Sequence, residues 1–250
     1  MGGKRPAIIA LICLGAGLLL AAALILSGPG VRGGLWSWST GLTILRWSAW
    51  TGLGVFVVSL VACFYLTRGS AKPGLACAAI GGLCGLLVFA IPASNLNKAR
   101  SLPRIHDITT DTQNPPTFVE IGPIRARTRA RNKIVYGGEE IAAQQRKGYP
   151  DIVPLNTTLP ARRAYDTSLA VAVELGWQII ASVPGKGRIE ATDTTFWFGF
   201  TDDISIRVTA LAAGSRIDIR SVSRVGRSDV GTNAARIRRF LSAVKSKLNA

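Results

Sequence analysis

The chain has 250 residues, enough for one large domain or two small units. Lysine and arginine number 30 against 14 aspartates and glutamates, so the formal net charge is +16 at pH 7. A basic surface suggests anionic neighbours such as lipid headgroups, nucleic acid or acidic proteins, and a solvated basic face beside a membrane is the alternative. All 14 acidic residues lie at or beyond Asp107, whereas the four cysteines lie in apolar runs before it. This distribution argues against a disulfide-stapled soluble domain, and no Cys–His spacing indicates a zinc site.

Three apolar runs near the N-terminus are each long enough to cross a bilayer. They are residues 7–26, 47–66 and 74–91. A signal peptide is the alternative for the first run, but the run is long for that purpose and Ser27-Gly28-Pro29 is a poor cleavage site. Residues 1–92 are therefore predicted to form a transmembrane anchor of three helices in a lipid bilayer.

The third run contains a G-x-x-x-G spacing at Gly81 and Gly85. Glycines at this spacing let a second helix approach closely, which suggests an oligomer through these two positions. The alternative is that lipid-embedded helices simply tolerate glycine.

Basic residues on the two sides of the predicted spans are nearly balanced in number. Because the first helix often sets the orientation, Lys4 and Arg5 favour a cytoplasmic N-terminus. Three spans would then place the rest of the chain outside the cytoplasm.

Residues 93–158 are predicted to form an extended, proline-containing arm packed on the domain that follows. Pro115-Pro116 imposes extended backbone and removes two donors. His106, the only histidine, stands near Asp107 and Asp111, so a metal site or a general base is one interpretation. A hydrogen-bonded structural histidine is the more common one.

Basic residues alternate within the stretch I-R-A-R-T-R-A-R-N-K. They are Arg125, Arg127, Arg129, Arg131 and Lys133. In an extended chain this period of two would place all five charges on one side, ready to meet phosphates, carboxylates or a membrane surface. A solvated loop is the alternative.

Residues 159–250 are predicted to form an α+β core in the order helix, four strands, helix, with an antiparallel sheet. The first helix runs from about Thr158 to Gly176, and the strands are residues 177–182, 188–194, 203–210 and 215–223. The last helix follows Thr232 and turns an apolar face inward. Its outward residues are expected to be Arg236, Arg238, Arg239, Lys245 and Lys247.

The last two strands are predicted to form a hairpin joined by the four residues 211–214. In that register Val208 meets Ile217 on the buried face and Arg207 meets Asp218 on the other, which satisfies both faces at once. The expected pairs are Ala210 with Ser215, Val208 with Ile217, Ile206 with Ile219, Arg207 with Asp218 and Asp203 with Val222. Asp203 would then lie on the open face, between Arg220 and Arg224.

Arginines and serines alternate after the hairpin and lead into the last helix. A helix N-terminus offers free N–H groups, and arginine offers paired donors that match phosphate or carboxylate. The predicted anion-binding residues are Arg220, Arg224, Arg227 and Ser228. An internal network in which Asp202, Asp203 and Asp229 neutralise the arginines is the alternative.

Several long motifs in the C-terminal part resemble those of a known family. They are I-H-D-I-T-T-D-x-x-x-P-P-x-F, Y-P-D-I-x-P-L, G-W-x-I, R-I-E-A-T, F-G-F-x-D-D-I-x-I-R-V and R-S-V-S-R-V-G-R-S-D-V-G-x-N-A-x-R-I-R. Together they resemble the bacterial and plastid domain-of-unknown-function family numbered fourteen ninety-nine over residues 101–248. The resemblance implies no particular chemistry. Family members often carry export signals, which implies a bacterial cytoplasmic membrane with the C-terminal domain outside the cytoplasm.

Three functions fit these observations, in this order. The first is a non-catalytic module that binds an anionic ligand or partner, such as an anionic lipid or an acidic protein, at the membrane surface. The second is a structural subunit of a membrane complex. The third is a hydrolase or metal-dependent enzyme built on His106, Asp107, Asp111, Asp202 and Asp203. No cofactor and no nucleic-acid partner are expected, since no signature motif for either occurs.

Overall fold

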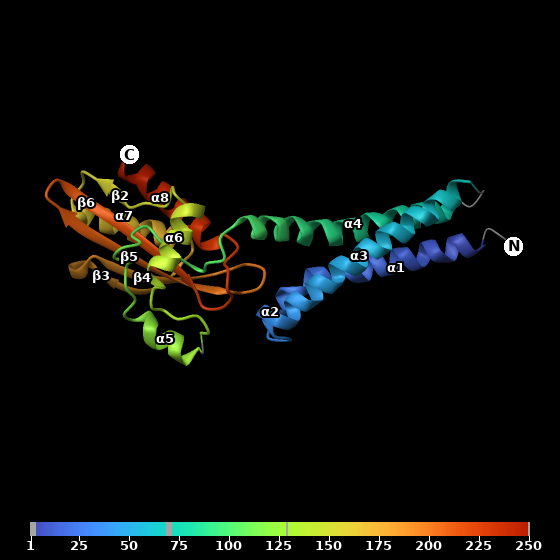
Figure 1. The fold of residues 1–250 in the computed structure, drawn as a ribbon, viewed down its shortest axis with the longest axis horizontal. Helices are drawn as coiled ribbons and strands as arrows, with labels where there is room; N and C mark the ends of the chain where they lie inside the picture. Colours follow the sequence, from blue (N-terminus) through green and yellow to red (C-terminus); the bar gives the residue numbers. More distant parts are fainter. Residues whose placement is uncertain (1–3, 69–71, 129, 250) are drawn as a thin grey trace. The chain divides into compact units, whose positions relative to one another are not determined.

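The computed structural model describes residues 4–68, 72–128 and 130–249. The chain forms two compact units, one of residues 1–100 with 196–199 and the other of residues 101–195 with 200–250. The architecture is α+β, with apolar helices first and a sheet with helices after them, as predicted (Figure 1).

The helical unit contains α1 (Lys4–Ser27), the short α2 (Pro29–Arg32), α3 (Trp38–Thr67) and α4 (Lys72–Ser101). By length and composition, α1, α3 and α4 can each cross a membrane, which confirms the three predicted spans. Both α3 and α4 extend beyond the apolar runs, and α4 continues through Pro92 to Ser101. The predicted ends were placed where hydropathy falls, and a drop in hydropathy marks the edge of the lipid-compatible stretch rather than the end of a helix.

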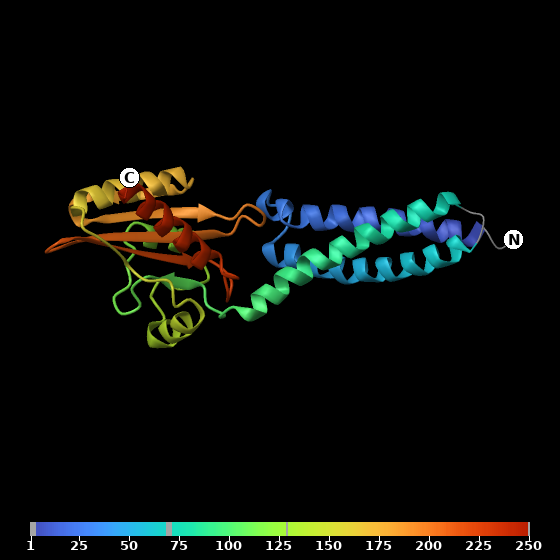
Figure 2. The ribbon, with the colours of Figure 1, turned by 90° about the horizontal axis from the view of Figure 1, so that it is seen from above.

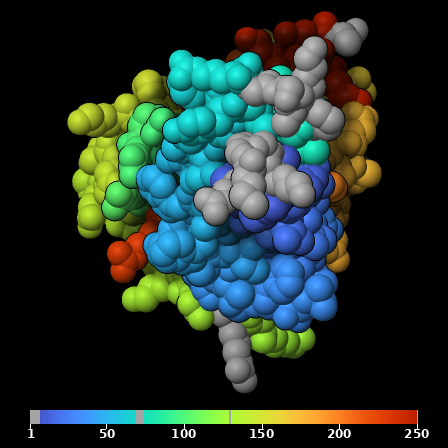
Figure 3. Space-filling model, turned by 90° about the vertical axis from the view of Figure 1, so that its right-hand side faces the viewer, coloured from blue at the N-terminus to red at the C-terminus, as the bar shows by residue number. Residues whose placement is uncertain are grey.

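Small residues let the three long helices pack closely. A side-chain carbon added at Gly17 of α1 would lie 2.8 Å from the carbonyl oxygen of Gly81, and one added at Gly52 of α3 would lie 2.8 Å from that of Gly85. The close approach expected at Gly81 and Gly85 therefore occurs between helices of one chain. Figure 3 looks onto the ends of these helices, whose blue and cyan atoms lie side by side.

The second unit is built on an antiparallel sheet in the order β1-β6-β5-β4-β3, with β2 also paired to β6. The strands are β1 (Asp107–Thr109), β2 (Leu155–Thr157), β3 (Gln178–Val183), β4 (Arg188–Thr194), β5 (Thr201–Leu211) and β6 (Gly214–Ser223). The four predicted strands are β3 to β6. The two short strands were not predicted, because three residues are too few to show an alternating pattern.

The predicted register of the β5–β6 hairpin is confirmed at every pair. The connection itself is shorter than expected. Leu211 pairs with Gly214, so only residues 212 and 213 form the turn. Gly214 has φ +122°, a conformation that glycine adopts without a Cβ penalty.

Helices α7 (Ala161–Glu174) and α8 (Thr232–Leu248) cover one face of the sheet, as Figure 2 shows. Their apolar side chains meet the alternating isoleucines of β5 and β6 in a single core. The ring of Trp177 stacks on Phe240 of α8 with centroids 5.4 Å apart. Gly176 ends α7 with φ +78°, which confirms the stop expected there.

The other face of the sheet is covered rather than open. Residues 111–128 and 130–134 lie across it, held by polar side chains of the strands. The carboxylate of Glu190, which is fully buried, accepts from the backbone N–H groups of Val119 and Ile121 at 2.9 Å each, and Ser205 Oγ donates to Thr117 O at 2.8 Å.

Residues 93–158 contain more regular structure than a continuous extended arm. Besides the end of α4 and the two short strands, they hold α5 (Ile121–Arg127) and α6 (Gly138–Gly148). Gln145 of α6 is buried and pairs with both backbone groups of Thr109, at 2.9 and 2.6 Å. The side-chain amide of Gln145 thus forms the hydrogen bonds with β1 that a neighbouring strand would otherwise form.

Candidate functional site

Asp203 of β5 joins two loops through two arginines. Its carboxylate is fully buried and accepts from Arg125 Nη1 at 2.5 Å and from Arg224 Nη2 at 2.8 Å. Arg125 belongs to α5, and Arg224 follows β6. Asp203 is therefore held between Arg125 and Arg224, not between Arg220 and Arg224 as predicted, because α5 brings a distant arginine onto a face that was expected to be open.

Asn132 fastens the same two loops through backbone groups. Its N–H donates to Arg224 O at 3.0 Å, and its side-chain amide donates to Ser223 O at 3.0 Å and Gly226 O at 2.8 Å. In return, Arg125 Nη2 donates to Asn132 O at 2.7 Å. The loop after α5 and the loop after β6 therefore lie side by side.

Exposed cations stand at the end of α5 and on both loops. Arg127, Lys133 and Arg227 are exposed, and none of the three makes an ion pair within the part of the chain that the structure describes. We call these three residues the basic patch. The arrangement can attract and bind negative charge, because two arginines share the single carboxylate of Asp203 and the three cations on α5 and the two loops add further positive charge.

The predicted row of alternating charges does not exist as such. Residues 121–127 form a helix, in which positions two apart point to nearly opposite sides, so Arg125 is buried while Arg127 is exposed. Arg129 lies outside the described residues. In the sequence, Lys133 and Arg127 are seen only as part of the row. No sequence signal marks Asn132, which holds the loop that carries Lys133 against the loop that carries Arg227.

Arg220 binds an internal carboxylate instead of an external anion. Its guanidinium bonds both oxygens of Asp107, at 2.9 and 2.7 Å, and also donates to Pro116 O and Ile134 O. The group is 3 % exposed, with the rings of Phe118 and Tyr136 about it. Burial, with a smaller effect of Asp107, raises the pKa of Tyr136 to about 12.

The N-terminus of α8 is capped by a carboxylate of the protein itself. Asp229 accepts from the N–H groups of Gly231 at 3.0 Å and Asn233 at 2.6 Å. Ser228 is engaged locally, since its hydroxyl accepts from the N–H of Val230. Of the four residues predicted to bind an anion, the structure thus ties Arg220, Arg224 and Ser228 into internal contacts and leaves Arg227 exposed.

Arg236 of α8 is buried, contrary to the prediction that it points outward. It bonds Asp202 and Asp193, each at 2.8 Å, on the helix-covered face of the sheet. Arg236 turns inward because the buried carboxylate of Asp202 binds it, although the helical pattern alone predicts a polar, outward position there. Burial raises the pKa of Asp202, and Arg236 opposes the shift.

The candidate catalytic residues do not converge. Asp202 and Asp203 lie on opposite faces of β5, and Asp111 bonds Arg207 and Arg216 at 3.0 and 2.8 Å. His106 contributes its carbonyl oxygen, which accepts from Ser223 and Asn233. Among the described residues, no group of three or more His, Cys, Asp or Glu side chains has a spacing that suits a metal ion.

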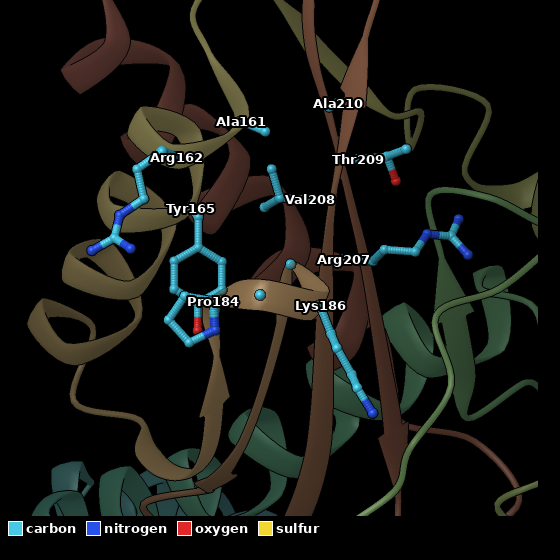
Figure 4. A pocket seen from close by; sticks show the side chains of 11 residues that line it. Ala161, Arg162, Tyr165, Pro184, Lys186, Arg207, Val208, Thr209 and Ala210 are labelled. Carbon is cyan, nitrogen blue, oxygen red and sulfur yellow. The ribbon is translucent and has the colours of Figure 1, made fainter.

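A cavity of about 430 Å³ lies in the sheet unit, beside the first turns of α7 and the short 3-10 turn at Pro184–Lys186. Its cations do not point into it. Figure 4 shows Arg162 and Arg207 extending to opposite sides and Lys186 turned away from Tyr165. The Tyr165 hydroxyl is already 2.7 Å from Ser182 Oγ. The basic patch is therefore the better candidate for a binding surface.

Comparison with known proteins supports the resemblance seen in the sequence. A family model described as a protein of unknown function, DUF1499, matches residues 107–244, from β1 into α8. No curated protein matches the chain significantly. The match covers more than half of the chain and leaves the three long helices outside it. The chain therefore belongs to the DUF1499 family, in a form that carries three N-terminal helices able to cross a membrane.

Proposed function

We propose that the protein is a membrane-anchored, non-catalytic module that binds an anionic ligand or partner at the membrane surface. One observation carries this proposal: within the described residues, the sheet unit pairs buried carboxylates but leaves some of its cations exposed and without a carboxylate partner. Buried carboxylates such as Asp107, Asp203 and Asp218 are each bound by arginine, whereas Arg127 and Lys133 remain exposed and unpaired among the described residues. Exposed carboxylates occur as well, but Glu139 and Glu174 are each paired with a basic side chain, whereas Arg127 and Lys133 carry charge that no ion pair among the described residues neutralises.

The contacts that the candidate catalytic carboxylates make support a binding role over a hydrolytic one. A general base has to reach the proton that it abstracts. Asp107 and Asp203 are instead engaged on both oxygens by arginine, and Asp202 is bound to Arg236.

The proposed location is the bacterial cytoplasmic membrane, with the sheet unit outside the cytoplasm. Lys4 and Arg5 before the first of three spans support it. A variant without its four cysteines, carrying Ala213→Cys in the exposed β5–β6 turn, tests the side. Reaction of intact spheroplasts with a membrane-impermeant maleimide is expected, and reaction only after lysis would place the unit in the cytoplasm.

Binding itself is tested with the full chain in phosphatidylcholine nanodiscs. Two anionic probes are offered separately, poly-glutamate and vesicles containing phosphatidylglycerol, with vesicles of phosphatidylcholine alone as the neutral control. We expect at least one anionic probe to bind, with an affinity that falls as salt rises. If neither probe binds more tightly than the neutral vesicles at low salt, the proposed function is wrong.

A further inference from the structure

We infer that the basic patch, Arg127, Lys133 and Arg227, is a docking site for the anionic phospholipid headgroups of a bilayer. This inference rests on the proposed function and names the ligand class and the residues. The patch belongs to a built surface, because Asp203 holds α5 and the loop after β6, and Asn132 holds the two loops together. Cations on a fixed backbone lose less conformational freedom on binding than cations on a free chain.

Chain connectivity favours a lipid surface over a soluble anion. Helix α4 ends at Ser101, and Ile105 is already fixed in the sheet unit, fully buried and accepting from the N–H of Asp229. The three residues between them span at most about 14 Å from Ser101 to Ile105. Because α4 runs only about ten residues, or about 15 Å, past the apolar run 74–91, the sheet unit stays on a short tether and meets headgroups at a high effective concentration.

An exposed apolar residue beside the patch adds to this argument. Val135 is 76 % exposed and stands two positions from Lys133. The backbone between them is held, because Ile134 O accepts from Arg220 Nη2 at 2.7 Å. A bilayer interface accepts an apolar side chain and cations together, whereas a free phosphate would leave Val135 in water.

The test measures transfer of the full chain, held in phosphatidylcholine nanodiscs, to separate vesicles of phosphatidylcholine and phosphatidylglycerol in a two-to-one mixture. The variant Arg127→Gln/Lys133→Gln/Arg227→Gln removes the patch. Since none of the three residues makes an ion pair among the described residues, its thermal unfolding should match that of the parent. We expect vesicle affinity to fall about fivefold for each cation removed, roughly a hundredfold in all, with a weaker salt dependence.

A matched control removes the same charge elsewhere. Arg163→Gln/Lys186→Gln/Lys245→Gln changes three exposed cations on α7, the 3-10 turn and α8. We expect it to retain most of the vesicle affinity of the parent. A second variant, Val135→Ser, should weaken vesicle binding to an extent that does not change with salt.

The outcomes separate this inference from the proposed function. Equal losses in the patch and control variants would mean that overall charge, not the patch, binds lipid, and the inference would fall while the proposed function stands. The same holds if the parent binds poly-glutamate but not the vesicles, which would point to an acidic protein as the partner. Binding to neither probe would overturn both.

Discussion

Arg125 and Asp203 lie 78 positions apart in the chain, yet their side chains form a hydrogen-bonded ion pair of 2.5 Å in which neither group is more than 5 % exposed. Arg224 shares the same carboxylate from the other side. One buried aspartate thus fixes both loops that carry the exposed cations. The stability of the fold and the geometry of the basic patch depend on the same residue.

Asp203→Asn should strongly destabilise the sheet unit. The change leaves two arginines without their counter-charge at a buried position, and breaking a buried pair costs about 3–5 kcal/mol. Chemical unfolding of the full chain in detergent measures the effect. Asp166→Asn is the control, because Asp166 pairs with Arg162 at the surface and such pairs contribute only about 0–1 kcal/mol. Similar losses in both variants would show that the Asp203 pair is not a special support of the fold.

Gly85→Ala should destabilise the helical unit. The added carbon would lie 2.5 Å from the carbonyl oxygen of Gly52, so α3 and α4 must move apart, and overpacking of this kind costs about 1–3 kcal/mol. Gly54→Ala is the control, because no atom lies within 4 Å of the added carbon. Thermal unfolding in detergent compares the two variants. If Gly85→Ala is as stable as Gly54→Ala, the close contact of α3 and α4 is absent in the protein.

Two tyrosines make the sheet unit sensitive to alkali. Burial, with the nearby Asp107 and Asp229, raises the pKa values of Tyr136 and Tyr149 to about 12 each from the ordinary 10. Between those pH values the unfolded chain loses the phenolic protons while the folded state keeps them. The contribution of the two phenol groups to the free energy of unfolding is therefore fully present below pH 10, and it is lost as the pH rises toward about 12.

The double variant Tyr136→Phe/Tyr149→Phe tests this expectation. Both hydroxyls are buried without a hydrogen-bond partner among the described residues, so removing them should leave stability at neutral pH unchanged or slightly higher. The alkaline loss of stability should be smaller than in the parent. Absorbance of tyrosinate in the folded parent should still be rising at pH values above 10. An identical alkaline decline in parent and variant would contradict the assignment.

Gln145→Ala should loosen the first strand locally. The Gln145 amide satisfies both backbone groups of Thr109, and a buried group left without a partner costs about 1–3 kcal/mol. We expect faster hydrogen exchange at the Thr109 amide, with little change in β4 or β5. Gln144→Ala alters the neighbouring side chain of α6 and serves as the control. Equal exchange at Thr109 in both variants would show that Gln145 does not protect β1.

Much of the fold was predictable because its signals are local. The isoleucines of β5 and β6 alternate with polar residues, and that period of two specifies both faces and the register without reference to any distant segment. Gly176 marks the end of α7 by its own conformational freedom. The three long helices follow from apolar length alone, although hydropathy misplaced the ends of α3 and α4.

The candidate site was predictable only in part. The abundance of arginine beside paired aspartates indicated either an anion site or an internal network, and the sequence contains no feature that separates the two. Arg220 and Arg227 look alike in the chain, but one is buried against Asp107 and the other is exposed. The difference arises because residues 111–128 and 130–134 cross one face of the sheet.

What the sequence determined by itself was therefore the strand register, the apolar faces and the membrane spans, each set by neighbours within a few residues. Only the tertiary structure decided which arginine meets which carboxylate. Arg125 and Asp203 are 78 positions apart, and Arg220 and Asp107 are 113. All such pairs have the same chemistry, so the choice among them depends on which backbone segments the packed fold brings together.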